Sequence, residues 1–188
     1  MGMVTISGSV TPTSLSTGHE PTDRPRTHGL VSTVWLAGRM RVHIATDHAA
    51  FELKEHLVAR LAAAGHEVVD HGASDYDAQD DYPDTCIPCA EAVVAEQGLG
   101  IVLGGSGNGE QLAANRVKGC RAILAYSTEI AELGRQHNDA NVVSLGGRFV
   151  SDDEAWAIVE TFLATPFSGD ARHQRRIDKM SAYEATRP

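Results

Sequence analysis

A glycine-rich segment carries the side chains of this sequence that are best suited to chemistry. Residues 104–110 read Gly-Gly-Ser-Gly-Asn-Gly-Glu. Glycines let backbone N–H groups approach an anion closely, and a helix that begins just after such a loop adds its positive end. The segment therefore predicts a site for a phosphate or a developing oxyanion, with Ser106, Asn108 and Glu110 as its polar side chains.

Other interpretations of this loop explain less of it. The spacing is not G-x-G-x-x-G, and the loop follows the third expected strand, whereas a dinucleotide fingerprint follows the first. A P-loop would need a Gly-Lys-Ser/Thr sequence, which is missing here. A tight turn with positive φ would account for the glycines but not for the three polar side chains among them.

Glu110 has two possible roles at the start of its helix. Its carboxylate either complements the helix dipole or acts as a general base. The dipole would lower the pKa of Glu110 and keep it ionised, whereas desolvation by a substrate would raise it. The helix position alone leaves both roles open.

Three further groups of residues have the chemistry of a site. Asp47 and His48 follow the first expected strand, and His137 and Asn138 follow the end of a helix. Basic side chains gather near the end of the chain at helical i, i+3 and i+4 spacing: Arg172, Arg175, Arg176 and Lys179. In an acidic chain this cluster indicates a local anion, although a solvated basic face would look the same. The pair Cys86 and Cys89 stands alone, so we expect packing cysteines and not a zinc or redox site.

Alternating strand and helix patterns predict the elements that position these residues. We expect strands at 41–45, 67–70, 99–103, 121–125 and 141–145. Helices are expected near 53–61, around 90–94, 110–115 and 128–136, from a capping box at 151–154, and over 170–184. This order predicts a Rossmann-like α/β fold with three α/β/α layers and a five-stranded parallel sheet. Ligands bind such sheets beyond the carboxyl ends of their strands.

Composition narrows the class of protein. The chain has 188 residues, 42% of them apolar, and a net charge of -9, which disfavours nucleic acid and anionic membranes as partners. No apolar run approaches a membrane span, and three cysteines suggest a reducing cytoplasm. Residues 1–39 are rich in Ser, Thr, Gly and Pro, so we expect most of this stretch to be disordered. We expect Met40 to be the natural start, with the preceding residues either an artefact of the chosen start site or a dispensable extension. Residues 40–188 are expected to form a single domain that ends in a helix.

The ordered set of motifs resembles the type B ribose-5-phosphate isomerases, a family that includes galactose-6-phosphate isomerase subunits. The similarity runs from Met40 to about Glu184 and is carried by these segments: Thr46-Asp-His-Ala49, Asp81-Tyr-Pro83, residues 104–110, His137-Asn138, Gly146-Gly-Arg148 and Arg172-His-Gln-Arg-Arg176. The resemblance implies a Rossmann-like fold, a homodimer or dimer of dimers, a cytoplasmic role in the pentose phosphate pathway, and no metal or cofactor. Ser106 stands where many members have a cysteine base, and Glu110 matches a branch that uses a glutamate.

On this resemblance the partner is a small phosphorylated sugar. Glu110 would move a proton between C2 and C1 through a cis-enediolate that Ser106 and the loop N–H groups stabilise. His137, helped by Asp47, would open the sugar ring. The expected substrate-binding residues are Asp47, His48, Tyr82, Gly105, Ser106, Gly107, Asn108, Gly109, Asn138, Arg148, Arg172 and Arg176. The alternatives are an isomerase of another four- or six-carbon sugar phosphate, or a phosphate- or nucleotide-binding module without chemistry.

The expected positions of these residues predict active sites shared between subunits. His137 and Asn138 precede the fifth strand, so they belong at the edge opposite the glycine loop. A strand of five residues spans about 17 Å, which is too far for His137 to reach a sugar in its own subunit's loop. A two-fold dimer would bring His137 to the loop of the neighbouring subunit.

Overall fold

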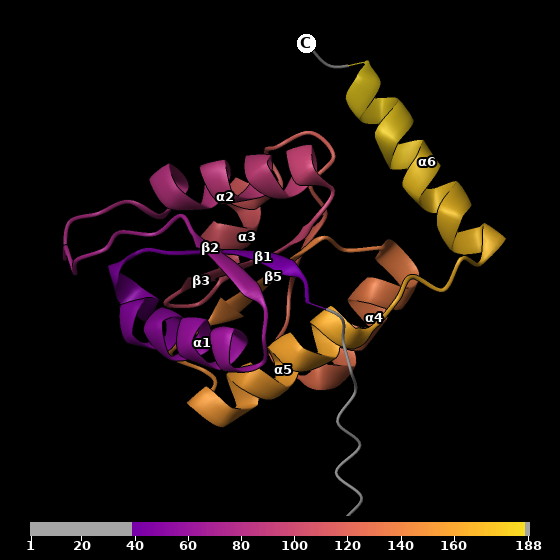
Figure 1. Ribbon diagram of the computed structural model, residues 1–188. Helices are drawn as coiled ribbons and strands as arrows, with labels where there is room; N and C mark the ends of the chain where they lie inside the picture. Colours follow the sequence, from indigo (N-terminus) through magenta and orange to yellow (C-terminus); the bar gives the residue numbers. More distant parts are fainter. Residues whose placement is uncertain (1–38, 187–188) are drawn as a thin grey trace, which may run out of the picture. The chain divides into compact units, whose positions relative to one another are not determined.

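Five short strands run parallel in one sheet, in the order β2-β1-β3-β5-β4 (Figure 1). The structure is a computed structural model, and it describes residues 39–186. The strands are β1 (Arg41–Thr46), β2 (Glu67–Asp70), β3 (Leu99–Gly104), β4 (Ala122–Leu124) and β5 (Val142–Gly146). This sheet confirms the expected α/β class and its five parallel strands.

Helices cover both faces of the sheet. They are α1 (Phe51–Ala63), α2 (Tyr82–Glu96), α3 (Asn108–Ala114), α4 (Thr128–Asn138), α5 (Asp152–Ala164) and α6 (Ala171–Ala185), with a 3-10 turn, η1 (His48–Ala50), before α1. Figure 1 shows α2 and α3 on one face of the sheet and α1, α4 and α5 on the other. The three layers of the expected architecture are therefore present.

Alternating side chains of the central strands supply the two halves of the core. Ile44 and Ile101 pack with leucines of α1 and with Phe162 of α5. Their neighbours Ala45 and Val102 point to the opposite face, where they pack against α2 and α3. Because successive side chains of a strand point to opposite faces, a continuous apolar run is what a sheet covered on both sides requires.

Several helix ends differ from the sequence prediction. Helix α4 continues through His137 to Asn138, so these two residues occupy its last turn and not a loop. The helix ends because Asp139 adopts a left-handed conformation, with φ of 44°. Helix α3 begins at Asn108, two residues before the expected start. The predicted capping box is confirmed, since Ser151 and Glu154 exchange hydrogen bonds at the start of α5.

The three cysteines are free and buried. Cys86 and Cys89 lie in α2 and pack with Cys120 in the core on that face of the sheet. The pair is therefore a packing pair, as the sequence predicts. Among residues 39–186, no helix is long and apolar enough to cross a membrane. The expected disordered extension at 1–39 falls almost entirely outside the described residues.

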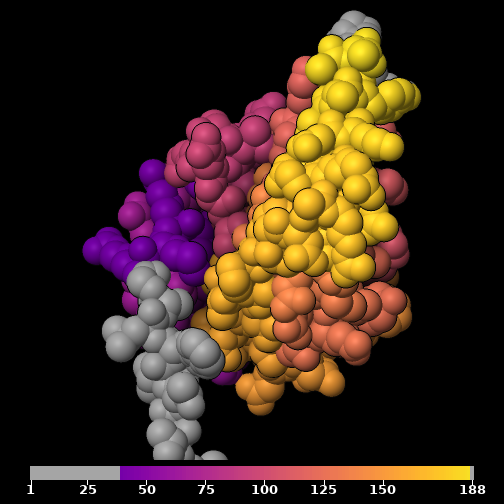
Figure 2. Space-filling view, turned by 90° about the vertical axis from the view of Figure 1, so that its right-hand side faces the viewer, coloured from indigo at the N-terminus to yellow at the C-terminus, as the bar shows by residue number. Residues whose placement is uncertain are grey.

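Helix α6 lies outside the three layers and packs beside α4. Figure 2 shows α6, in yellow, forming a ridge on the surface next to the orange α4. His173 and Ile177 are its buried residues. The His173 ring lies 4.3 Å, centroid to centroid, from the His137 ring of α4. The basic side chains of α6 therefore lie on a helix that packs against the last turn of α4.

Candidate active site at the carboxyl edge of the sheet

Loops that leave β1, β3 and β5 meet at the carboxyl edge of the sheet. The backbone N–H of Gly147 donates to the carbonyl of Gly104 at 2.9 Å, and that of Arg148 donates to Gly105 at 3.2 Å. These bonds join the loop after β5 to the glycine loop. The guanidinium of Arg148 lies over Gly105, 2.9 Å from the place where a Cβ atom would stand.

The glycine loop is fixed by a left-handed glycine and by a hydrogen bond from β5. Gly107 has φ of 79°, a left-handed conformation that glycine adopts without strain, and its carbonyl accepts a bond from Ser144 Oγ at 2.7 Å. Ser106 Oγ accepts bonds from the backbone N–H of Asn108 at 3.4 Å and from its side-chain amide at 3.3 Å. The loop thus leads directly into α3 with Ser106 at its turn.

Glu110 is buried at this edge, with 4% of its surface exposed. Its Oε2 atom has no hydrogen-bond partner among residues 39–186. Burial raises the pKa of Glu110, and the charge of Asp47 adds to this effect, while bonds from the backbone of Glu110 and Gly107 oppose it. Of the two opposing effects that the sequence left open, desolvation outweighs the start of the helix, because the fold itself removes water from the carboxylate. A carboxylate in this environment is suited to accept a proton.

The Glu110 carboxylate fits over Gly104 so closely that a side chain there would displace it. A Cβ atom on Gly104 would lie 1.9 Å from Glu110 Oε1. We expect Gly104→Ala to keep the fold with some loss of melting temperature and to lose most of the activity, because the carboxylate must move. Gly98→Ala is the matched control, since a Cβ there makes an ordinary 3.6 Å contact. Melting curves and kcat measure both effects, and an unchanged kcat in Gly104→Ala would contradict this positioning.

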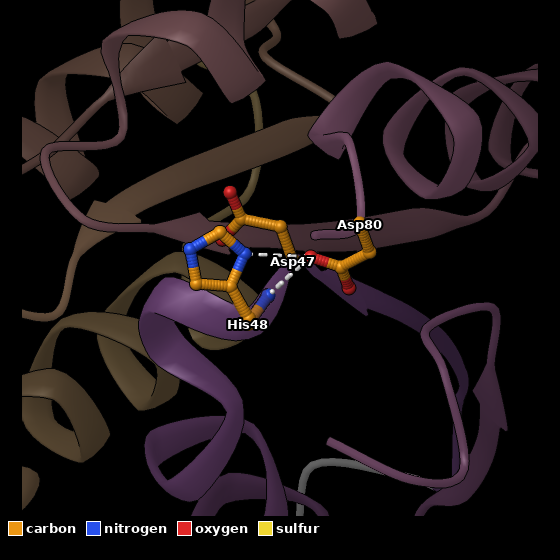
Figure 3. Close-up of side chains that lie close together, drawn as sticks. All are labelled: Asp47, His48 and Asp80. Atoms are coloured by element: carbon orange, nitrogen blue, oxygen red, sulfur yellow. Dashed lines mark hydrogen bonds and ion pairs between the residues drawn. The ribbon is translucent and has the colours of Figure 1, made fainter. Parts of the chain in front are cut away.

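Asp47, His48 and Asp80 form a polar cluster beside the loop (Figure 3). Asp47 Oδ1 accepts from the backbone N–H of Ala49 at 3.0 Å, and Asp80 Oδ1 bonds the Nδ1 atom of His48 at 2.7 Å. The pKa of His48 is raised, mainly by its bond to Asp80. Within the described part of the chain, this cluster alone has the spacing of metal ligands, with its atoms within 4.8 Å of one another. The carboxylate and imidazole atoms of this cluster already bond to one another and to the backbone. Nothing in the cluster requires a metal, and the expected absence of a metal stays a prediction.

Sequence reasoning missed Asp80. It is one of four aspartates within residues 75–81, and nothing in their pattern separates it from the others. Tyr82, by contrast, is one of the residues that the sequence predicts for the site, and it lies beside the glycine loop. It begins α2, and its ring stands 2.7 Å from the place where a Cβ atom on Gly109 would be.

The remaining candidate residues lie at the opposite edge of the same chain. His137 and Asn138 end α4, just before β5 begins, and so they face the amino ends of the strands. Arg172 and Arg176 are exposed on α6, where Arg172 has one ion pair, with Asp170 at 3.8 Å. The structure therefore divides the predicted site residues into two groups. One group lies at the carboxyl edge of the sheet: Asp47, His48, Tyr82, the glycine loop, Glu110 and Arg148. The other group, His137, Asn138, Arg172 and Arg176, lies away from that edge.

A groove of about 400 Å³ runs along the open side of β4, between these two groups. Its wall is largely apolar and includes Ile123, Leu124, Ile130 and Leu133. Gln111 of α3 and Tyr126, which follows β4, line it together with Asn138 of α4. Tyr126 is 67% exposed, and Leu112, which follows Gln111 in α3, is 58% exposed. Apolar surface at an open sheet edge is typical of an interface.

Comparison with known proteins gives one consistent family. The model of the Ribose/Galactose Isomerase family matches residues 42–180. The ribose-5-phosphate isomerase B of Mycolicibacterium paratuberculosis is 54% identical over 78% of this chain and 93% of its own length. That of Mycobacterium tuberculosis is 53% identical over 78% of this chain and 91% of its own. The solved ribose-5-phosphate isomerase B of Mycoplasma genitalium, with bound ribulose-5-phosphate, superposes with a TM-score of 0.75 at 44% identity, over 78% of this chain and 97% of that one.

Proposed function

This chain belongs to the ribose/galactose isomerase family, and from that membership we propose that it interconverts ribose 5-phosphate and ribulose 5-phosphate. It is an aldose–ketose isomerase. Two findings support this substrate pair: the names of the similar proteins and the ribulose-5-phosphate bound in the Mycoplasma genitalium structure. The observation that carries the chemistry is the buried Glu110 carboxylate at the end of the glycine loop, one oxygen of which has no hydrogen-bond partner within residues 39–186.

Glu110 is the general base of the proposed mechanism. It takes the proton from C2 of the open-chain aldose and returns it to C1, while a proton passes from O2 to O1. The electron pair left by the C2 proton forms the double bond of a cis-enediolate. Ser106 and the backbone N–H groups of residues 105–109 would donate hydrogen bonds to its oxygens, as an oxyanion hole does.

Ring opening and substrate binding use the other candidate residues. His137, helped by Asp47, would move the protons that open the ring. Asn138, Arg148 and Tyr82 would hold hydroxyl groups, and Arg172, Arg176 and His48 would bind the phosphate. Binding the phosphate at a distance from C1 and C2 positions the reacting carbons over Glu110.

Two copies of the chain are needed to assemble this set. The groove beside β4 has Tyr126 near the carboxyl edge and Asn138 near the amino edge. A two-fold axis through the groove would pair it with its copy in reverse direction, so that the Asn138 end of one subunit meets the glycine-loop side of the other. We therefore place the dimer interface on this groove and its apolar surroundings.

The same subunit would supply His137 and the two arginines. The His173 ring of α6 contacts the His137 ring at a tilt of 45°, with centroids 4.3 Å apart, and His173 Nδ1 bonds Ser168 Oγ at 2.9 Å. These contacts tie α6 to the end of α4, so Arg172 and Arg176 would enter the partner's site together with His137. A reducing, cytoplasmic compartment suits the chain, since its three cysteines are free.

Solvent proton exchange tests the proposed reaction. In deuterated water the purified chain should convert ribose 5-phosphate to ribulose 5-phosphate and incorporate deuterium at C1 of the ketose or C2 of the aldose. Nuclear magnetic resonance of the sugar measures both. A chain that binds the sugar phosphate without exchange or conversion would be the binding module that the sequence left open.

The exposed arginines of α6 give a prediction about binding. Arg172→Ala and Arg176→Ala should each raise KM for ribose 5-phosphate by about tenfold, because each removes a charge-assisted bond to the phosphate. Ribose without phosphate should remain a poor substrate in all cases. Lys118→Ala removes an exposed positive charge elsewhere and is the control. If KM is unchanged in both arginine variants, the phosphate binds at another place.

A further inference from the structure

Asp80 fixes His48 through two contacts to a single oxygen. Its Oδ1 atom accepts the backbone N–H of His48 at 2.9 Å and bonds the ring Nδ1 at 2.7 Å (Figure 3). The first contact holds the backbone at the start of η1, and the second fixes the rotation of the ring. Because a carboxylate bonds Nδ1, that nitrogen carries a proton. The Nε2 atom points away from Asp80 and is left for another partner (Figure 3).

His48 lines a hollow of about 560 Å³ next to the loop that follows β5. Tyr76 stands edge-on to the imidazole with centroids 6.2 Å apart, and Gly147 lines the far side. The other charged residues of the lining are Glu52 and Asp152. Asp47 and Asp80 face the ring as well. An anion that enters this hollow meets carboxylates of the same chain on several sides, so His48 is the residue of this lining whose positive charge favours binding.

We infer that Asp80 is a positioning residue, which holds the His48 ring with Nε2–H directed at the phosphate of the substrate. The inference rests on the proposed function, because it takes the anion to be a sugar phosphate. An imidazolium donates both ring N–H groups, one to Asp80 and one to a phosphate oxygen. Asp80 itself does not touch the substrate.

The electrostatics of the cluster act in the same direction. The bond to Asp80 raises the pKa of His48, the charge of Asp47 adds to this, and burial opposes it. A raised pKa means that the ring stays positive to a higher pH than a free histidine does. Without the Asp80 charge, the ring would become neutral closer to the ordinary value of about 6.5.

The segment that carries Asp80 is anchored at its start. Lys54 of α1 is fully buried, and its Nζ atom donates to Asp70 Oδ2 at 2.6 Å and to the carbonyl of Ala73 at 3.1 Å. These contacts fix the chain directly after β2, and α2 fixes it after Asp81. Asp80 is therefore presented to His48 between two fixed ends.

The test compares Asp80→Asn with Asp75→Asn in the full chain. Asp75 is an exposed aspartate of the same segment, bonded to Ser74 Oγ at 3.1 Å, so its variant removes the same charge without touching His48. At neutral pH, Asp80→Asn should raise KM for ribose 5-phosphate, and the inhibition constant of inorganic phosphate, by about tenfold. Its kcat should change much less. As pH falls, the two enzymes should converge, because the ring becomes protonated without help.

A double-variant comparison separates positioning from a structural role. If Asp80 acts through His48, then Asp80→Asn should have no further effect on KM in a His48→Gln background. Additive effects, a KM equal to wild type at every pH, or a loss in kcat alone would each overturn the inference. An active wild type with an unaffected Asp80→Asn enzyme refutes the inference alone, whereas an inactive wild type refutes the proposed function.

A measurement on the wild type covers the case in which Asp80→Asn does not fold. Nuclear magnetic resonance should show His48 titrating above about 6.5, and its signal should shift when inorganic phosphate is added. A His48 that titrates at or below this value, or that ignores phosphate, would overturn the inference without any variant of Asp80.

Discussion

Glu110→Gln is expected to fold and to bind sugar phosphate as the wild type does, yet to lose about 10²- to 10⁴-fold in kcat. An amide has the shape of the carboxylate but cannot accept the C2 proton. Steady-state kinetics with ribose 5-phosphate measure the loss. Glu129→Gln is the matched control, because Glu129 also lies in the first turn of a helix but is exposed. A Glu110→Gln enzyme with kcat near wild type would remove Glu110 from the mechanism.

Stability and pH dependence of this variant follow from the raised pKa. Because burial raises the pKa of Glu110, its ionised form costs folding free energy at pH values above the unfolded pKa of about 4.3. Glu110→Gln should therefore melt no lower than the wild type at neutral pH.

In the wild type, kcat/KM should fall as pH decreases through the raised pKa of Glu110, since the base becomes protonated. The acidic limb should lie above the range of an ordinary glutamate.

Mixing two inactive variants is expected to restore activity. Glu110→Gln damages the glycine-loop side of a site, and His137→Ala damages the side that we assign to the partner. In a mixed dimer one site carries both lesions and the other carries neither. With random exchange about half of the dimers are mixed, so about a quarter of the wild-type activity per chain should return. The recovered activity is measured by refolding the two chains together and assaying the mixture with ribose 5-phosphate.

A second mixture is the control for this complementation. Ser106 and Glu110 both belong to the carboxyl edge of one chain. Glu110→Gln mixed with Ser106→Ala should therefore gain nothing, because every site of a mixed dimer keeps one lesion. Recovery in this control, or none with His137→Ala, would mean that each site is built differently from the arrangement proposed here.

Local patterns in the sequence were sufficient to predict the sheet and its covering helices. Apolar runs such as Leu99–Leu103 form strands that are buried on both faces, and helical spacing at Leu53, Leu57 and Leu61 predicts α1. Helix ends were less predictable, since α4 ends at Asn138 and the left-handed residue that follows it is Asp139, where a glycine would have marked the end more clearly. The burial of Lys54 was hidden as well, because its partners Asp70 and Ala73 belong to another element.

The candidate site could be predicted wherever a motif is continuous, as in residues 104–110. Asp80 could not, because its contact with His48 joins residues 32 positions apart and depends on how the segment after β2 folds back. The direction of the pKa shift in Glu110 also depends on tertiary packing. The helix position is visible in the sequence, whereas the exclusion of water from the carboxylate follows from the assembled fold.

The burial of the three cysteines has a consequence for chemical resistance. Burial raises the pKa of Cys86 and Cys120 to about 12 and that of Cys89 well above its usual value. Alkylating and oxidising reagents attack exposed thiolates, and these thiols are neither exposed nor ionised at neutral pH. The glycine loop meanwhile has a hydroxyl group at position 106. An enzyme built in this way would continue to turn over during oxidative or electrophilic stress that inactivates enzymes with a cysteine base.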